Sequence, residues 1–509
     1  MNKTLSSLIA VAVLSCAAAA RAAEPAAAAE TKKPAPEPPK PEQSVTQHSL
    51  TAGGKTIGYT ATAGTLILRN NKDEPTAAVG YIAYTQRDVK DPGTRPITFA
   101  YNGGPGSSSI WLHMGALGPR RIVTADPGPT PPAPYRVVDN AESILDKTDL
   151  VMIDPVGTGL SHAVGDSKDK DFWGVDPDIE SVSRFIKQYA SDNLRWSSPK
   201  YLLGESYGTT RAAGVVDYLQ TRENMAFNGV ILVSVFLDPV ASADWPGNDQ
   251  AYPLVLPTFA AVAAYHHLLP STPAKLEPFL DEVRKFALGD YAAALRKGDA
   301  LTEPERDAVA EKLHQYTGLS VDYVKKARLR LRESLFTQEL MREHHQTVGR
   351  LDARFTGVTF DLLAEDAEYD PQSAAISSAF TAAFLDYYHG ELKFGQGKSY
   401  KILNYEANNA WDWKHKIPSG DTLPLANTAL DLAHALGYNP NLRVLVMNGI
   451  YDLATPFMAT ESTIDHLGLE KQLRSHVQMK YYDAGHMMYI NEPALKQFKA
   501  DLAAFIDGR

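Results

Sequence analysis

The chain has a single cysteine among its 509 residues, Cys16, which lies close to the N-terminus. Beyond that position the sequence therefore excludes disulfides, a cysteine nucleophile and a cysteine-ligated metal centre. Long apolar runs are missing too: none reaches the roughly 18 residues that a membrane-spanning helix needs, so we expect no such helix. An excess of basic charge is also absent, since the formal net charge is -10 at pH 7. This argues against a nucleic-acid partner.

The first residues have the pattern of an export signal. A lysine precedes the apolar run 5–14, and an Ala-x-Ala cleavage motif ends at Ala22. We therefore assign residues 1–22 to a signal peptide and expect an exported protein, periplasmic or secreted. Lipid attachment at Cys16 is the alternative. Residues 23–45 are rich in proline and alanine, which predicts a disordered linker.

Strand and helix patterns alternate along most of the remaining chain. Short apolar runs that end in Gly/Pro-rich loops predict buried strands of a mostly parallel sheet, and the runs between them have helical spacing. This pattern indicates a doubly wound α/β domain that comprises residues 46–244 and 403–509. Residues 245–402 lose the alternation and carry helical periodicity with charged faces. They predict a mainly helical cap inserted into the sheet domain.

The segment Gly-Glu-Ser-Tyr-Gly, residues 204–208, lies between a strand pattern and a helical pattern. The motif alone is weak evidence, but in this position glycines on both sides of a serine permit a strained strand-to-helix turn. Ser206 is therefore the candidate nucleophile. The N–H groups that open the following helix, beginning with Tyr207, would face a developing oxyanion.

A serine nucleophile needs a base and an acid. In this type of domain the acid and then the base follow the nucleophile, each in a loop after a later strand. Asp452 and His486 occupy those two places, so we expect His486 to transfer the proton and Asp452 to orient the imidazole. Asp483 is a rival acid, but it lies only three residues before His486, too close along the chain for the usual approach to Nδ1.

Adjacent histidines occur at 266–267 and at 344–345. Two ligands for one metal ion on a helix face are expected at i,i+4 spacing rather than side by side, so we expect no metal ion. The glycine-rich segment 101–109 lacks the Gly-Lys-Ser/Thr ending of a phosphate-binding loop, and we expect no cofactor.

Five segments in order resemble the signature blocks of the serine carboxypeptidases, peptidase family S10; they are residues 101–109, 154–162, 204–208, 448–452 and 484–488. The resemblance implies the α/β-hydrolase fold, peptide substrates, and hydrolysis of C-terminal peptide bonds through an acyl-enzyme intermediate. It also implies that Gly104 and Tyr207 offer the oxyanion-hole N–H groups. Asn102, Gly103 and Glu205 would hold the terminal carboxylate of the substrate.

The chain departs from this family at two positions. Ser107 stands where many relatives have a cysteine, and Ala116 stands where the family usually carries a second glutamate. The second departure leaves the carboxyl groups of the carboxylate-binding site incomplete, so the sequence does not decide between a strict exopeptidase and a broader peptidase or esterase. Two further alternatives stay open: an acyltransferase or esterase with the same triad, and a non-catalytic cell-envelope binding protein. For Glu205, in a half-buried pocket, we expect a raised pKa and a neutral form that donates a hydrogen bond.

Overall fold

The computed structural model describes residues 39–508. The signal peptide assigned to residues 1–22 and most of the linker assigned to 23–45 lie outside the described residues. Strand β1 (Gln43–Ala52) begins within the last three residues assigned to the linker, because these pair with residues 62–64 of β2 (Lys55–Arg69). Among the helices of the described part, none is long and apolar enough to cross a membrane.

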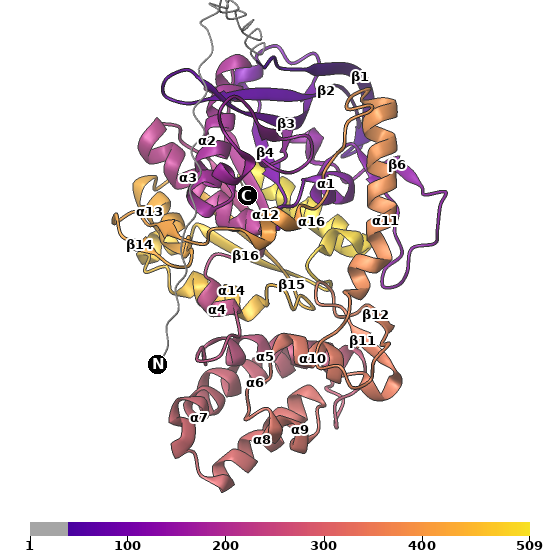
Figure 1. The fold of residues 1–509 in the computed structure, drawn as a ribbon, viewed down its shortest axis with the longest axis vertical. Coiled ribbons are helices and arrows are strands. Elements are labelled where there is room, and N and C mark those ends of the chain that lie inside the picture. Colours follow the sequence, from indigo (N-terminus) through magenta and orange to yellow (C-terminus); the bar gives the residue numbers. More distant parts are fainter. Residues whose placement is uncertain (1–38, 509) are drawn as a thin grey trace, which may run out of the picture. The chain divides into compact units, whose positions relative to one another are not determined.

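One sheet of ten strands forms the centre of the described fold (Figure 1). Its order is β1-β2-β3-β7-β4-β9-β10-β15-β16, with β8 (His162–Ala163) beside β3. The first three strands are antiparallel and β3 also pairs antiparallel with β7, whereas the six strands from β7 to β16 run parallel to one another. The predicted α/β fold with a mostly parallel sheet is therefore confirmed. The other strands are β3 (Pro75–Gln86), β4 (Ile97–Tyr101), β7 (Asp149–Ile153), β9 (Lys200–Ser206), β10 (Gly229–Val235), β15 (Arg443–Gly449) and β16 (Val477–Tyr482).

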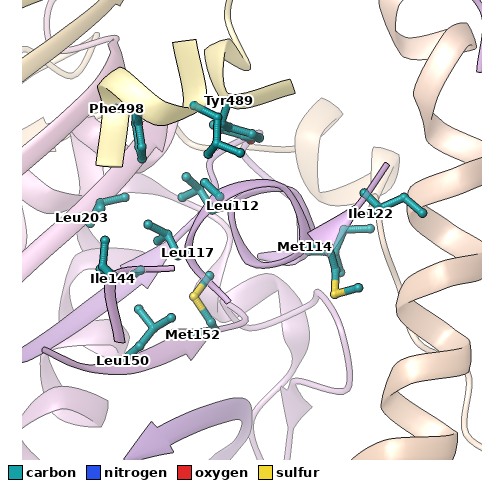
Figure 2. Packing of buried hydrophobic residues seen from close by; sticks show 14 of the residues in the cluster. Leu112, Met114, Leu117, Ile122, Ile144, Leu150, Met152, Leu203, Tyr489 and Phe498 are labelled. Atoms are coloured by element: carbon teal, nitrogen blue, oxygen red, sulfur yellow. The ribbon is translucent and has the colours of Figure 1, made fainter. Parts of the chain in front are cut away.

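The central strands bury both of their faces, as their continuous apolar runs predicted. Successive side chains alternate, so that Leu202 of β9 lies in one core and Leu203 in the other. The first core is covered by α2 (Val175–Asp192), α3 (Tyr207–Glu223) and α13 (Ala429–Tyr438). The second is covered by α16 (Glu492–Ile506) and α11 (Pro371–Asp386). Part of this second core is drawn in Figure 2.

Helices α5 to α10 form a separate layer, at the bottom of Figure 1, with a third core of their own. They are α5 (Ala251–Tyr265), α6 (Leu276–Phe286), α7 (Ala292–Lys297), α8 (Glu303–Thr317), α9 (Val321–Lys326) and α10 (Glu333–Glu339). This third core also includes Tyr451, Leu453 and the start of α14 (Phe457–Asp465), which surround the loop after β15. The insertion is thus packed on the loop that carries Asp452.

Two details differ from the sequence pattern. The helical periodicity of residues 320–345 is interrupted between α9 and α10, because Arg328 and Leu329 have φ angles of 52° and 65°, which a right-handed helix does not accommodate. In addition, α11 does not join the core of the inserted helices. Its Phe380 and Phe384 are buried in the second core of the sheet domain, and in Figure 1 the helix runs along that domain.

Candidate active site

Ser206 lies where β9 ends and α3 begins, in a strained turn. Its φ and ψ angles are 60° and -131°, a region that non-glycine residues rarely adopt. The strand and the helix approach so closely that a Cβ atom on Gly204 would lie 2.0 Å from the carbonyl oxygen of Gly208. The glycines of the motif therefore make the turn possible, as predicted, and Ser206 is left on the wall of a cavity.

His486 lines the same cavity and pairs with the fully buried Asp452. His486 Nδ1 lies 2.8 Å from Asp452 Oδ2, and both side chains are buried. Burial disfavours the imidazolium, but the charges of Asp452 and Glu205 outweigh it and raise the pKa of His486. The protonated form of His486, which would result if it accepted a proton from Ser206, is therefore stabilised.

The carboxylate of Asp452 is held by its own loop. Its Oδ1 accepts hydrogen bonds of 2.9 Å from the backbone N–H groups of Ala454 and Thr455. The Thr455 hydroxyl donates to Oδ2 at 2.5 Å and also lies 3.3 Å from His486 Nδ1. The sequence analysis missed Thr455, although its position three residues after the acid was a usable signal. The rival Asp483 instead interacts with the hydroxyl of Tyr451.

The glycine-rich loop after β4 lies against the first turn of α3. A Cβ atom on Gly103 would lie 2.5 Å from the backbone nitrogen of Tyr207, so only glycine fits there. The buried Arg211 of α3 donates to the carbonyl oxygen of Asn102 at 2.8 Å and ties the loop to the helix. Gly104 and Tyr207, the predicted oxyanion-hole residues, consequently line the same cavity as Ser206.

Glu205 is more buried than expected, with only 3% of its surface exposed. Asn102 Nδ2 donates to its Oε1 at 2.9 Å, and Asn102 Oδ1 accepts from the backbone N–H of Leu112 at 3.0 Å, which fixes the amide. Burial raises the pKa of Glu205 to about 7, against the opposing effects of His486, Tyr489 and Asn102. The predicted direction of this pKa shift is confirmed. Asn102, Gly103 and Glu205 all line the cavity.

The segment that contains Ala116 packs against Tyr489, from another part of the chain. Ala116 is buried in the second core, and the ring of Tyr489 packs directly on its neighbour Gly115. Figure 2 shows Tyr489 among the residues of that core. The Tyr489 hydroxyl lies close enough to Glu205 to lower its pKa, although it forms no hydrogen bond with any of the described residues. The phenol group of Tyr489 thus lies near the carboxyl group of Glu205, a neighbour that the sequence analysis did not predict.

The cavity has a volume of about 440 Å³, the size of a small-ligand or peptide site. Its polar lining residues include Asn102, Glu205, Ser206 and His486. The walls include Trp111, Phe236, Ile376, Trp413 and Met487. Arg350, from the segment that precedes α11, also lines it and was not a sequence candidate.

The sheet order and the strained turn after β9 define an α/β-hydrolase fold. The family model described as serine carboxypeptidase, Peptidase_S10, matches residues 66–251. The predicted resemblance to the serine carboxypeptidases is thereby confirmed for this part of the chain, and the match supports the predicted enzyme class, a serine-type hydrolase. No curated protein sequence matches the chain.

Three solved structures that align with the chain are as follows. The carboxypeptidase Kex1 of Saccharomyces cerevisiae, described as prohormone-processing, aligns with a TM-score of 0.54 and 14% identity, over 89% of this chain and 92% of that one. Proline iminopeptidase of Mycobacterium smegmatis aligns with a TM-score of 0.36 and 14% identity, over 87% of this chain and 98% of that one. A carboxyl esterase of Bacillus coagulans aligns with a TM-score of 0.32 and 12% identity, over 91% of this chain and 98% of that one.

Proposed function

We propose that the protein is an exported serine carboxypeptidase that hydrolyses C-terminal peptide bonds with Ser206, His486 and Asp452. The observation that carries the proposal is the hydrogen bond between His486 and Asp452 at the wall of the cavity that Ser206 also lines. A base, an oriented acid and a serine in a strained turn at one cavity are the parts of a nucleophilic triad. Export rests on the sequence of residues 1–22 alone.

The reaction follows from these positions. Ser206 Oγ attacks the scissile carbonyl carbon while His486 Nε2 accepts the hydroxyl proton, and Asp452 stabilises the imidazolium through Nδ1. The N–H groups of Gly104 and Tyr207 would donate to the oxyanion. The C–N bond then breaks as His486 gives its proton to the leaving amine. Water attacks the resulting ester, again with His486 as the base, and releases the shortened peptide and free Ser206.

The terminal carboxylate would be recognised by a neutral Glu205 together with Asn102 and the N–H of Gly103. A carboxyl with a pKa of about 7 is mostly protonated in mildly acidic solution, where it donates a hydrogen bond instead of repelling a carboxylate. The Kex1 structure, whose described activity is that of a carboxypeptidase, supports the same type of substrate for this chain.

Two measurements test the proposal. A fluorophosphonate probe should label wild-type protein and fail to label Ser206→Ala, whereas an unlabelled wild type would indicate a non-catalytic binding protein. Digestion of a peptide library, read by mass spectrometry, should give products that lack one C-terminal residue at a time. Products in which an added amine or alcohol replaces the released group would indicate an acyltransferase instead.

A further inference from the structure

Arg350 is the only lysine or arginine among the described residues that lines the active-site cavity. Its side chain is 53% exposed, so it is accessible to whatever occupies the cavity. The guanidinium uses Nε to donate to Glu333 Oε2 at 3.0 Å. Within residues 39–508 its Nη1 and Nη2 donate no hydrogen bond. Two parallel donors therefore remain for a ligand.

The backbone of Arg350 is fixed between the acid and base loops. Its N–H donates to Asp370 Oδ2 at 2.6 Å, and its carbonyl oxygen accepts from the N–H of Leu453 at 3.1 Å. The next carbonyl, that of Leu351, accepts from the N–H of His486 at 2.7 Å. These bonds involve no side-chain atom of Arg350, so a substitution at this position leaves them in place.

The charged groups around Arg350 are Glu333, Asp370, Asp452 and His486. The carboxylates of Glu333, Asp452 and Asp370 raise the pKa of Arg350, so the guanidinium stays cationic. Glu333 alone among these carboxylates forms an ion pair with it. Glu205, which also lines the cavity, is largely neutral in acidic solution. The cavity therefore offers a fixed cation to an anionic ligand.

We propose that Arg350 is a specificity-determining residue that binds a side-chain carboxylate of the substrate, so that peptides with Asp or Glu next to the cleaved bond are preferred. The proposal rests on the proposed peptidase function and adds the substrate class to it. Two guanidinium nitrogens match two carboxylate oxygens, and such charge-assisted pairs are the strong hydrogen bonds of binding sites. Glu333 competes with the substrate for the same cation.

The test compares peptides that differ only by Glu versus Gln, or Asp versus Asn, at the last or at the penultimate position. In the wild type the acidic member of a pair should have a kcat/KM roughly 10-fold higher or more, the range of hydrogen bonds to charged groups. In Arg350→Gln this ratio should fall to about 1, and in Glu333→Gln it should rise. Arg306→Gln is a matched control, because Arg306 lies on α8, paired with Glu303 at 2.7 Å, and does not line this cavity.

The outcomes separate the two proposals. A wild type that cleaves neutral peptides without preferring acidic ones, or a ratio unchanged in Arg350→Gln, overturns the role of Arg350 only. If Arg350→Gln instead abolishes the preference for a free C-terminus over a C-terminal amide, Arg350 binds the terminal carboxylate and the side-chain proposal is wrong. If the wild type cleaves no peptide, the proposed function fails. The role of Arg350 is then tested with pairs of small esters that differ by a carboxylate, by comparing the ratio of their kcat/KM values in the wild type and in Arg350→Gln.

Discussion

His486 Nδ1 and Asp452 Oδ2 lie 2.8 Å apart, although the two residues are 34 positions apart in the chain. They follow neighbouring parallel strands, β15 and β16, whose carboxyl ends meet at one edge of the sheet. Asp483 lies closer to the histidine in sequence, but it interacts with Tyr451 instead. The geometry of the strands, rather than distance along the chain, brings Asp452 to His486.

The first prediction concerns the triad. Ser206→Ala and His486→Ala should reduce kcat to nearly the same residual level, because triad members act as a unit and their losses do not add. Asp452→Asn should lower kcat by about 10⁴ through the wrong histidine tautomer. Asp483→Asn is the matched control and should retain most of the activity. Activity that survives Asp452→Asn but not Asp483→Asn would show that the acid is misassigned.

The second prediction concerns the pH dependence of binding through Glu205. Its pKa is raised to about 7, so the neutral donor dominates below that pH and the repelling carboxylate above it. The KM for a peptide with a free C-terminus should therefore be low in acid and rise as the pH passes 7. Glu205→Gln keeps an uncharged donor, and its KM should not vary with pH. KM measured from pH 5 to 8.5 for both proteins checks this.

A separate readout distinguishes Glu205 from a merely structural residue. Ionised Glu205 helps to raise the pKa of His486, and His486 in turn lowers that of Glu205, so the two groups titrate as a coupled pair. Removing the carboxylate lowers the pKa of His486, and the acidic limb of kcat should move to lower pH in Glu205→Gln. An acidic limb that stays in place would contradict the coupling.

The third prediction concerns Tyr489, whose hydroxyl lowers the pKa of Glu205. Tyr489→Phe removes that hydroxyl, so the pKa of Glu205 rises and the increase in KM should begin at a higher pH than in the wild type. Tyr482→Phe is the control: it removes a hydroxyl 2.8 Å from Asp501 in the same core, and should cost stability without moving the KM profile.

The strands, the helices that cover the sheet and the strained serine turn could be predicted, since each depends on local pattern. Apolar runs that end in glycine identify β9 and β15 directly, and Gly204 is required by contacts within its own turn. The interruption of the helical pattern at Arg328 could not be predicted in this way. The positive φ angles at Arg328 and Leu329 depend on how the inserted helices pack together. The spacing of apolar residues along the sequence does not predict that packing.

The residues of the candidate site also fall into those that the sequence predicts and those that it does not. Ser206, Asp452 and His486 are recognisable because each follows a strand pattern. Tyr489 and Arg350 are not, because their relation to Glu205 and to the cavity depends on how distant segments pack. The ring of Tyr489 packs on Gly115, where a Cβ atom would lie 2.4 Å from it. Arg350 reaches the cavity because its segment is hydrogen-bonded to the loops of Asp452 and His486.

The fourth prediction concerns stability and His415, which is 3% exposed between two carboxylates. Its Nδ1 lies 2.6 Å from Asp176 and its Nε2 lies 2.9 Å from Asp431. Burial opposes its charge, but the two carboxylates raise its pKa from 6.5 to about 9. The stabilisation is therefore complete below pH 6.5 and is lost as the pH rises to 9.

Denaturant unfolding at pH 6, 7.5 and 9.5 measures this effect. The wild type should lose on the order of 3 kcal/mol over that range from this group, since one pKa unit corresponds to about 1.4 kcal/mol. His415→Gln should be less stable at pH 6 and should show a flatter dependence. His434→Gln is a comparison variant, because His434 is exposed and has a single partner, Asp217. Equal pH slopes for wild type and His415→Gln would contradict the prediction.

The most direct test of the central claim compares one peptide that has a free C-terminus with the same peptide as its C-terminal amide. A cavity in which neutral Glu205, Asn102 and Gly103 receive a carboxylate should favour the free acid in kcat/KM, more strongly at pH 5 than at pH 7. We expect this preference in the wild type and its reduction in Glu205→Ala. Hydrolysis of the amide at least as fast as the free acid at both pH values would contradict carboxylate recognition and indicate a broader peptidase or esterase.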